Sequence, residues 1–273
     1  MQGPSGIKLI ACDVDGTLVV GGQVVTPELK DIFAELRRRG VFAALCTGRM
    51  PHWTTAVADE LGVMEYLICT EGGHVLHRPT GKDLHYAAID PTVINAVAAR
   101  IEEASDIGLA AMCHDTIWTT SRLAARRAHW WGHQWKIVRD PRKVPSPVLL
   151  VLFGPRDVME RTARSLREEL PARMAFIHGV EDQGDYSHFK ICAPETDKGV
   201  AAERLVRHLG GDRTQILAFG DYLNDLGIMK HAGCSICPRE AHPLVRRAAT
   251  HVSPFSAEEG FVVREIKRIF GLP

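Results

Sequence analysis

The sequence predicts an α/β protein in which a parallel sheet covered by helices carries an inserted α+β unit. Apolar runs at residues 7–12, 41–46 and 66–69 are nearly continuous, and segments with helical spacing separate them. Strands that are apolar on both faces are typical of parallel sheets with helices on either side. A change of pattern over residues 82–185 predicts the inserted unit.

The helices in the first part of the chain have recognisable ends. The first is expected over residues 27–39, because its apolar residues follow helical spacing, Thr26 can cap it and Gly40 can end it. A second helix is expected from about Pro51 to Leu61. Ligands of such sheets bind at the carboxyl ends of the strands, so the residues after each strand are candidates for a site.

The helices and strands in the rest of the chain can be predicted from the same patterns. Within the insertion we expect helices at residues 91–104, from 121 and near 158–170, and strands at 109–113, 116–119, 148–153 and 174–178. The parallel pattern then resumes with strand 189–192, helix 198–209, strand 215–219 and helix 226–231. We therefore expect a core of residues 1–81 and 186–273 and an inserted domain of residues 82–185.

Composition and charge favour a small-molecule partner. The chain has 273 residues, of which 45% are hydrophobic, enough to fill real cores. The 33 Lys and Arg residues balance the 33 Asp and Glu residues, so no net field attracts nucleic acid or an anionic membrane. The sequence also lacks a leader pattern and a run of about 18 apolar residues. We expect a cytoplasmic monomer or homodimer that binds neither nucleic acid nor membrane.

Two carboxylates follow the first predicted strand, in the segment Asp13-Val14-Asp15-Gly16-Thr17-Leu18. Residues two apart on an extended chain point the same way, so Asp13 and Asp15 can face one ligand. A divalent cation would relieve their mutual repulsion. Gly16 lets the backbone turn, and Thr17 offers a hydroxyl to an anion. The alternative is an acidic turn without a ligand.

A second acidic segment, Gly220-Asp221-Tyr222-Leu223-Asn224-Asp225, also follows a predicted strand. Two acidic strand ends can converge on one ion, and Mg²⁺ prefers carboxylates, a carbonyl, waters and a substrate phosphate. Asp13, Asp15 and Asp221 would serve as its ligands. Taken alone, the second segment could equally be a turn before a helix that Asn or Asp caps.

Two further segments could hold a phosphate. Thr47, in Thr47-Gly48-Arg49, lies at the end of the second predicted strand, where its hydroxyl and nearby N–H groups can bind phosphate oxygens. Lys198 lies at a predicted helix start, where its ammonium can offset phosphate and carboxylate charge. Each alone could be an ordinary turn or a solvated lysine.

Together these segments resemble the four motifs of the haloacid dehalogenase superfamily of phosphohydrolases, in the order D-x-D-G-T, T-G-R, K-G and G-D-x-x-N-D. The resemblance covers the whole chain. It is greatest to the Cof-like phosphatases, whose cap domain is inserted between the second and third motifs, as residues 82–185 are here. It implies a Rossmann-like parallel sheet core and an α+β cap domain that covers the site and selects the substrate.

The resemblance also implies a role for each motif residue. Asp13 is the expected nucleophile, which forms an aspartyl phosphate, and Asp15 is the expected general acid and base. The expected ligands of a Mg²⁺ cofactor are Asp13, Asp15 through its backbone carbonyl, and Asp221. The expected supporting residues are Asn224 and Asp225. The expected phosphate-binding residues are Thr47, Gly48 and Lys198.

The substrate is less well defined. Glu71 stands where the family often has asparagine, and an acidic side chain that points inward would repel phosphate. It either faces elsewhere or meets a cationic or hydroxyl-rich part of the substrate, and Arg49 is a second possible substrate contact. Residues 126–135 are dense in Trp, His and Arg, and they could grip a substrate or pack the cap or a dimer contact.

The expected function is Mg²⁺-dependent hydrolysis of a small phosphorylated metabolite, such as a sugar phosphate or a cofactor phosphate. A phosphomutase, which uses the same aspartyl phosphate, is the alternative within the superfamily. A non-catalytic metabolite-binding protein on this fold is the alternative from another class, although such a protein would not need a second catalytic carboxylate.

Overall fold

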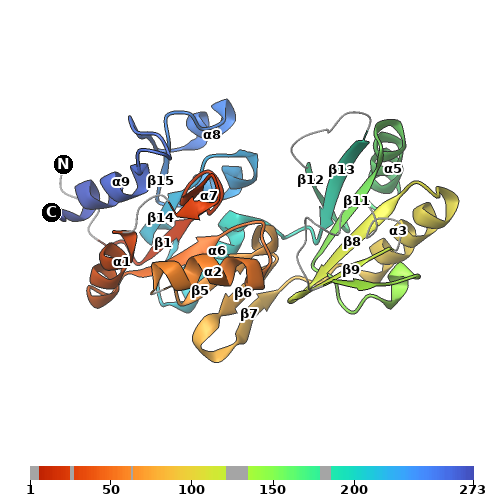
Figure 1. Cartoon of the computed structure of the whole chain (residues 1–273), viewed down its shortest axis with the longest axis horizontal. Helices are drawn as coiled ribbons and strands as arrows, with labels where there is room; N and C mark the ends of the chain where they lie inside the picture. Colours follow the sequence, from red (N-terminus) through yellow and green to blue (C-terminus); the bar gives the residue numbers. More distant parts are fainter. Residues whose placement is uncertain (1–5, 25–27, 63, 121–134, 179–185) are drawn as a thin grey trace. The chain divides into compact units, whose positions relative to one another are not determined.

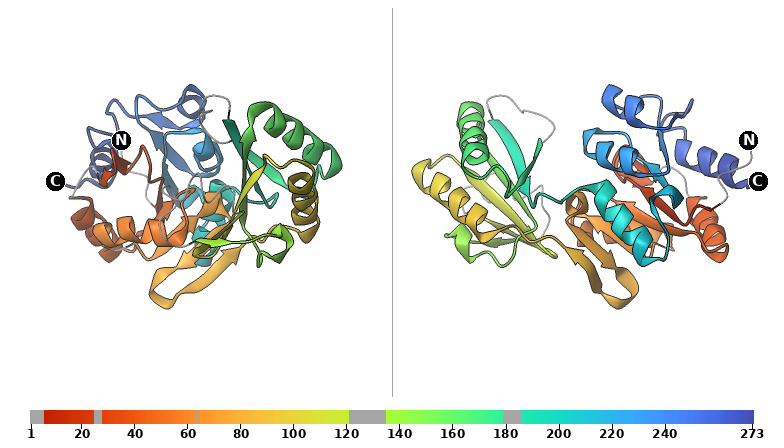
Figure 2. Two further views of the ribbon diagram at one scale, coloured as in Figure 1. Left: turned by 45° about the vertical axis from the view of Figure 1, so that its right-hand side comes forward. Right: turned by 180° about the vertical axis from the view of Figure 1, so that it is seen from behind.

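The computed structural model describes residues 6–24, 28–62, 64–120, 135–178 and 186–273, and it divides into two compact units (Figures 1 and 2). The first unit comprises Met1–His85 and Asp197–Pro273, and the second comprises Tyr86–Thr196. The boundaries expected from the sequence, at residues 82 and 185, fall earlier in the chain at both ends. The difference arises because strand Lys82–Tyr86 extends the first sheet and strand Tyr186–Cys192 belongs to the second sheet.

An eight-stranded sheet forms the centre of the first unit, in the order β16-β15-β14-β1-β4-β5-β6-β7. The pairs from β16 through β14, β1 and β4 to β5 are all parallel, and β6 runs antiparallel to β5. The strands are β1 (Leu9–Cys12), β4 (Phe42–Cys46), β5 (Tyr66–Cys69), β6 (His74–His77), β7 (Lys82–Tyr86), β14 (Ile216–Phe219), β15 (Cys234–Cys237) and β16 (His251–Val252). A short hairpin of β2 (Val19–Val20) and β3 (Gln23–Val24) follows β1. The predicted α/β class with a parallel core sheet is confirmed.

Helices cover both faces of this sheet because successive residues of a strand point to opposite sides. Ile10 and Cys12 of β1 pack with residues of α1, α2 and α9, whereas Leu9 and Ala11 pack with residues of α6, α7 and α8. The helices are α1 (Leu29–Arg38), α2 (Pro51–Leu61), α6 (Lys198–His208), α7 (Leu226–His231), α8 (Pro243–Ala248) and α9 (Phe261–Phe270). The expected cap of α1, Thr26, lies outside the described residues.

The second unit has a six-stranded sheet, in the order β10-β9-β8-β11-β13-β12. The strands are β8 (Gly108–Cys113), β9 (Thr116–Thr119), β10 (Trp135–Ile137), β11 (Leu149–Pro155), β12 (Ala175–His178) and β13 (Tyr186–Cys192). Two helices, α3 (Pro91–Glu103) and α5 (Arg156–Glu169), pack with Leu109, Leu150 and Ile191 in a separate apolar core. The helix expected from residue 121, and all but Trp135 of the Trp-rich segment 126–135, lie outside the described residues.

One strand belongs to a different sheet from the one that the sequence predicted. Residues 189–192, expected as a parallel strand of the core, are part of β13, which runs antiparallel to β11 and β12. Phe189 and Ile191 pack into the core of the second unit, and Lys190 between them is only partly buried. A short apolar run does not distinguish a parallel core strand from a half-buried antiparallel one. Among the helices that the structure describes, none is long and apolar enough to cross a membrane.

Candidate active site

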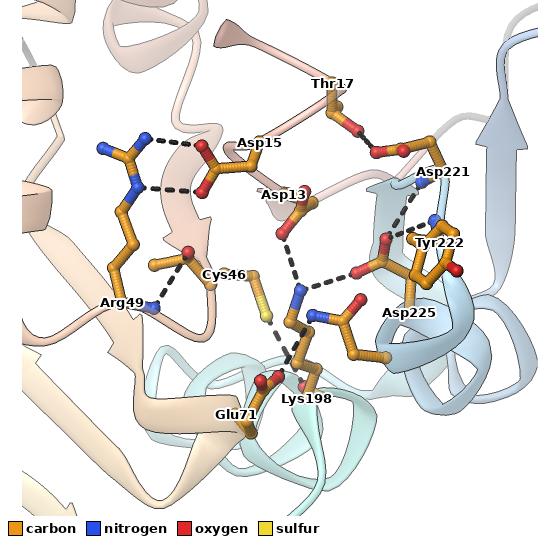
Figure 3. Close-up of polar contacts among 12 residues, drawn as sticks. Asp13, Asp15, Thr17, Cys46, Arg49, Glu71, Lys198, Asp221, Tyr222 and Asp225 are labelled. Carbon is orange, nitrogen blue, oxygen red and sulfur yellow. Dashed lines mark hydrogen bonds and ion pairs between the residues drawn. The ribbon is translucent and has the colours of Figure 1, made fainter. Parts of the chain in front are cut away.

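Four turns of the first unit, each at the carboxyl end of a strand, meet at one edge of the parallel sheet (Figure 3). They follow β1, β4, β5 and β14, and these strands are consecutive neighbours in the sheet. In chain order the turns carry Asp13 and Asp15, then Thr47 and Gly48, then Glu71, and finally Asp221 to Asp225. Helix α6 adds Lys198 at its first residue. The structure thus places the four sequence motifs in one site.

The Lys198 ammonium is buried between two carboxylates. Its Nζ donates to Asp13 Oδ1 at 2.6 Å and to Asp225 Oδ1 at 2.7 Å, and the three side chains are 1%, 7% and 0% exposed, respectively. Burial by itself lowers the pKa of Lys198, but the charges of Asp13 and Asp225 outweigh burial and hold this pKa well above its ordinary value. Lys198 is therefore a fixed positive charge at neutral pH.

One ammonium does not neutralise the carboxylates around it. Burial raises the pKa of Asp13, the Asp225 charge raises it further, and Lys198 offsets only part of the two effects. Burial likewise raises the pKa of Asp221 to about 6. A cation placed among these groups would stabilise their charged forms, because opposite charge within a few ångströms favours ionisation.

The side chains also provide a suitable set of ligand atoms for such a cation. One oxygen from each of Asp13, Asp221 and Asp225 lies within 4.8 Å of the other two. A donor set made of carboxylate oxygens suits a hard divalent ion such as Mg²⁺, which commonly completes its shell with waters and a substrate phosphate. Two members of the ligand set expected from the sequence, Asp13 and Asp221, belong to this group. Asp225, expected only to support the site, is the third.

The turn after β14 is ordered by its own carboxylates. Asp225 Oδ2 accepts hydrogen bonds from the backbone N–H groups of Asp221 at 2.9 Å and Tyr222 at 3.1 Å, so one Asp225 oxygen serves the turn and the other serves Lys198. The Thr17 hydroxyl donates to Asp221 Oδ1 at 2.8 Å, which links this turn to the one after β1. Gly16 has φ +83°, and a Cβ there would lie 2.5 Å from the Asp221 carboxylate. Only glycine fits this position.

The Asp15 side chain turns to a different partner. Arg49 donates to both of its oxygens, from Nε at 2.8 Å and from Nη2 at 2.5 Å, and the Asp15 side chain is 60% exposed. Asp13 and Asp15 therefore bind two different cationic side chains instead of facing one ligand with both carboxylates. The Arg49 backbone N–H donates to the buried Thr47 hydroxyl at 3.2 Å, which ties the pair to the turn after β4.

Sequence reasoning missed one residue that positions Lys198. Asp197 caps helix α6, and its Oδ1 accepts hydrogen bonds from the N–H groups of Gly199 at 2.7 Å and Val200 at 3.0 Å. This cap fixes the first turn of α6 and with it the origin of the Lys198 side chain. An aspartate directly before a predicted helix is a capping signal, so the sequence did contain the information.

Glu71 faces into the site. Glu71 is only 3% exposed, and its Oε2 accepts a hydrogen bond from Asn224 Nδ2 at 3.1 Å. Its Oε1 lies beside Gly48, where an added Cβ would be 2.5 Å away. Of the two alternatives that the sequence left for Glu71, the structure excludes the one in which it faces elsewhere.

Comparison with known proteins assigns the family. The family model of the haloacid dehalogenase-like hydrolases matches residues 10–265. HMP-PP phosphatase of Citrobacter koseri is 27% identical over 90% of this chain and 89% of its own length. A haloacid dehalogenase-like hydrolase structure from Bacteroides thetaiotaomicron covers 97% of this chain and 100% of its own, with TM-score 0.82 and 19% identity. The structure of the HAD subclass IIB sugar phosphatase BT4131 covers the same shares, with TM-score 0.77 and 16% identity.

The chain belongs to the haloacid dehalogenase-like hydrolases. It is an enzyme of that family, and the resemblance to the superfamily's Cof-like phosphatases that its motifs indicated is confirmed.

Proposed function

We propose that the protein is a Mg²⁺-dependent phosphomonoesterase that hydrolyses small phosphorylated metabolites through an aspartyl phosphate on Asp13. The observation that carries the proposal is the buried Lys198 between Asp13 and Asp225, since it orients a carboxylate at the end of a central strand. One relative is named for action on HMP-PP, and a related structure is named as a sugar phosphatase. Both names support a small phosphorylated metabolite as the substrate.

In the first proposed step, an oxygen of Asp13 attacks phosphorus while the bond to the leaving oxygen breaks. Such a transfer needs in-line alignment and neutralisation of charge more than it needs further covalent help. Lys198 fixes Asp13 and offsets charge, and the Thr47 hydroxyl and the Gly48 N–H would bind phosphoryl oxygens. A Mg²⁺ ion held by Asp13, Asp221 and the Asp15 carbonyl, with Asp225 beside it, would supply further positive charge against those oxygens.

Asp15 would act as the general acid and then as the general base. Its carboxylic acid donates a proton to the leaving oxygen as the P–O bond breaks. Its carboxylate then takes a proton from a water molecule, which attacks the phosphorus and releases Asp13 and phosphate. Arg49 holds both Asp15 oxygens in the structure, so one of these hydrogen bonds must loosen before Asp15 can carry the proton. Arg49 would thus be a positioning residue for Asp15.

The proposal is tested by phosphate release from a panel of phosphorylated metabolites, with Mg²⁺ or with EDTA. We expect hydrolysis only with Mg²⁺, and we expect Asp13→Asn to lower it by roughly 10³-fold or more, as for removal of a central catalytic group. Asp31→Asn removes an exposed carboxylate of α1 and is the matched control, with unchanged turnover. Retention of a tenth of the activity in Asp13→Asn, or full activity in EDTA, would contradict the proposal. Transfer of phosphate back to the substrate instead of its release would indicate the phosphomutase.

A further inference from the structure

Two cationic side chains contact carboxylates of the four turns, among the residues that the structure describes. Lys198 is 1% exposed and lies between Asp13 and Asp225, so its ammonium is already directed at buried carboxylates. Arg49 is 29% exposed, and it contacts Asp15, whose side chain is 60% exposed (Figure 3). Solvent therefore reaches the Arg49 guanidinium, and a substrate bound at this edge of the sheet can reach it as well.

The backbone of Arg49 is fixed independently of this pair. Its N–H donates to the Thr47 hydroxyl at 3.2 Å, and its carbonyl oxygen accepts a hydrogen bond from the N–H of Thr70 at 2.9 Å. The contact with Asp15 involves the side chain alone. The guanidinium can therefore change its partner while the turn after β4 keeps its place.

The pair is of a kind that exchanges readily. Ion pairs between exposed side chains add little stability, so the loss of this one costs little. Nε and Nη2 of Arg49 donate to Asp15, whereas Nη1 lies outside the pair. A guanidinium fork fits the oxygens of a phosphate as well as those of a carboxylate. The proposed reaction already requires Asp15 to give up one of these bonds, and an oxyanion of the substrate could take its place.

The position of Arg49 limits where such an oxyanion can lie on the substrate. A general acid must come within about 3 Å of the leaving oxygen. Nε and Nη2 of Arg49 lie 2.8 and 2.5 Å from the Asp15 oxygens, so the guanidinium would lie on the order of 6 Å from the leaving oxygen. An oxyanion attached within two bonds of the leaving oxygen can span this gap, with a hydrogen bond of about 2.8 Å to the guanidinium.

We propose that Arg49 is a specificity-determining residue that exchanges Asp15 for a second oxyanion of the substrate, carried on the leaving group within two bonds of the leaving oxygen. Two groups have this chemistry: the inner phosphoryl group of a diphosphate, and a carboxylate on the carbon that bears the ester oxygen. The inference rests on the proposed function, because it takes the leaving oxygen to be the one that Asp15 protonates. Esters whose leaving group carries only hydroxyl groups there should be poorer substrates.

The test uses two pairs of compounds that differ in this oxyanion. 2-Phosphoglycerate and glycerol 2-phosphate are both esters of a secondary alcohol, and they differ in a carboxylate in place of a hydroxymethyl group. Methyl diphosphate, cleaved at its terminal phosphorus, and methyl phosphate form the second pair. The measured quantity is the ratio of kcat/KM within each pair, for the wild-type protein, Arg49→Gln and Arg49→Lys, all with Mg²⁺.

We expect Arg49→Gln to lower kcat/KM for the compounds with the second oxyanion roughly 10-fold to 100-fold more than for their partners, the range for loss of a hydrogen bond between charged groups. Arg49→Lys keeps the charge without the fork and should fall between the two proteins. A fall in one pair only would identify the oxyanion as the phosphoryl group or as the carboxylate.

An Arg49 that only positions Asp15 gives a different pattern. The two esters of the first pair need the same proton, so they would lose activity equally. In the second pair methyl phosphate would lose more, because its leaving group needs protonation most. Either result would refute the inference.

The matched control is Arg39→Gln. Arg39 also donates to a carboxylate, Glu35 at 2.6 Å, and its side chain is 46% exposed, but it follows α1 and lies outside the four turns. Its substitution should leave both ratios unchanged.

A binding measurement separates this inference from the proposed function. Titration calorimetry with the first pair of compounds uses Asp13→Asn, with and without Arg49→Gln. Hydrolysis by the wild-type protein with equal losses in Arg49→Gln would refute the role of Arg49 alone. Absence of hydrolysis, together with tighter binding of 2-phosphoglycerate that depends on Arg49, would refute the proposed reaction and support the role of Arg49. Absence of both hydrolysis and this preference would refute the two proposals together.

Discussion

Replacement of Lys198 by methionine should destabilise the first unit strongly. Methionine keeps most of the unbranched apolar stem, so the main change is the loss of an ammonium that binds Asp13 at 2.6 Å and Asp225 at 2.7 Å. These carboxylates are 7% and 0% exposed, so water is a poor replacement for the lost partner. Removal of one member of a buried ion pair costs about 3–5 kcal/mol, because the remaining charge is left uncompensated.

The free energy of unfolding should be measured by urea denaturation in EDTA, so that no divalent ion replaces the ammonium. In thermal melts each kcal/mol corresponds to about 2–4 °C for domains of comparable size, so we expect a fall of roughly 6–20 °C. Lys230→Met, at an exposed position of α7, is the matched control and should change stability by less than about 0.5 kcal/mol.

A second substitution tests the cause. If the loss comes from unpaired charge, Asp225→Asn should cost less in the Lys198→Met protein than in the wild-type protein, with a coupling energy of about 1–3 kcal/mol. Strict additivity of the two substitutions would refute the interpretation that Lys198, Asp13 and Asp225 form a buried charge network. A Lys198→Met protein as stable as the wild type would refute it as well.

Four further outcomes can be measured. Gly48→Ala should lower stability by about 1–3 kcal/mol, because its Cβ would lie 2.5 Å from Glu71 Oε1; an equal loss in a Glu71→Ala background would exclude that contact as the cause. Thiol labelling at pH 8 should be fastest at Cys234, the one cysteine of seven that is not buried. Burial raises the pKa of Cys113 to about 12, so its labelling rate should still rise with pH at pH 10, and a plateau near pH 9 would argue against this. Asp15→Asn should slow hydrolysis of an alkyl phosphate about 10²-fold more than that of p-nitrophenyl phosphate, whose leaving group needs little protonation, and equal losses would remove Asp15 as the general acid.

The placement of the site could be predicted from the sequence because it depends on where strands end. Continuous apolar runs before Asp13, Thr47 and Asp221 indicate buried parallel strands, and parallel strands end at a common edge of the sheet. The boundaries of helices could also be predicted, because they depend on local sequence signals. The expected helix at residues 226–231 coincides with α7, and proline marks the start of α2.

The direction of individual side chains could not be predicted, because it is set by the turns and not by the strands. The rule that alternate residues share a face holds within β1, but β1 ends at Cys12. Asp13 and Asp15 lie in the turn beyond it, where Asp13 binds Lys198 and Asp15 pairs with Arg49. Glu71 points inward because of left-handed backbone angles that nothing in its local sequence requires. The place of Asp225 in the acidic group likewise depends on a folded turn, in which it binds the backbone of Asp221.

The position of the insertion has a consequence for how the protein is made. Asp13 and its partner Lys198 are 185 residues apart, and β1 pairs with β14 only after the whole of the second unit has been synthesised. At translation rates of about 5–20 residues per second, the nascent β1 waits roughly 10–40 s for its neighbour. The second unit is a continuous stretch, Tyr86–Thr196, with its own apolar core, and it can complete its fold during this interval. On the ribosome, the inserted unit would therefore finish folding before the unit that surrounds it, and until then β1 would keep an unpaired apolar edge on the side that later binds β14.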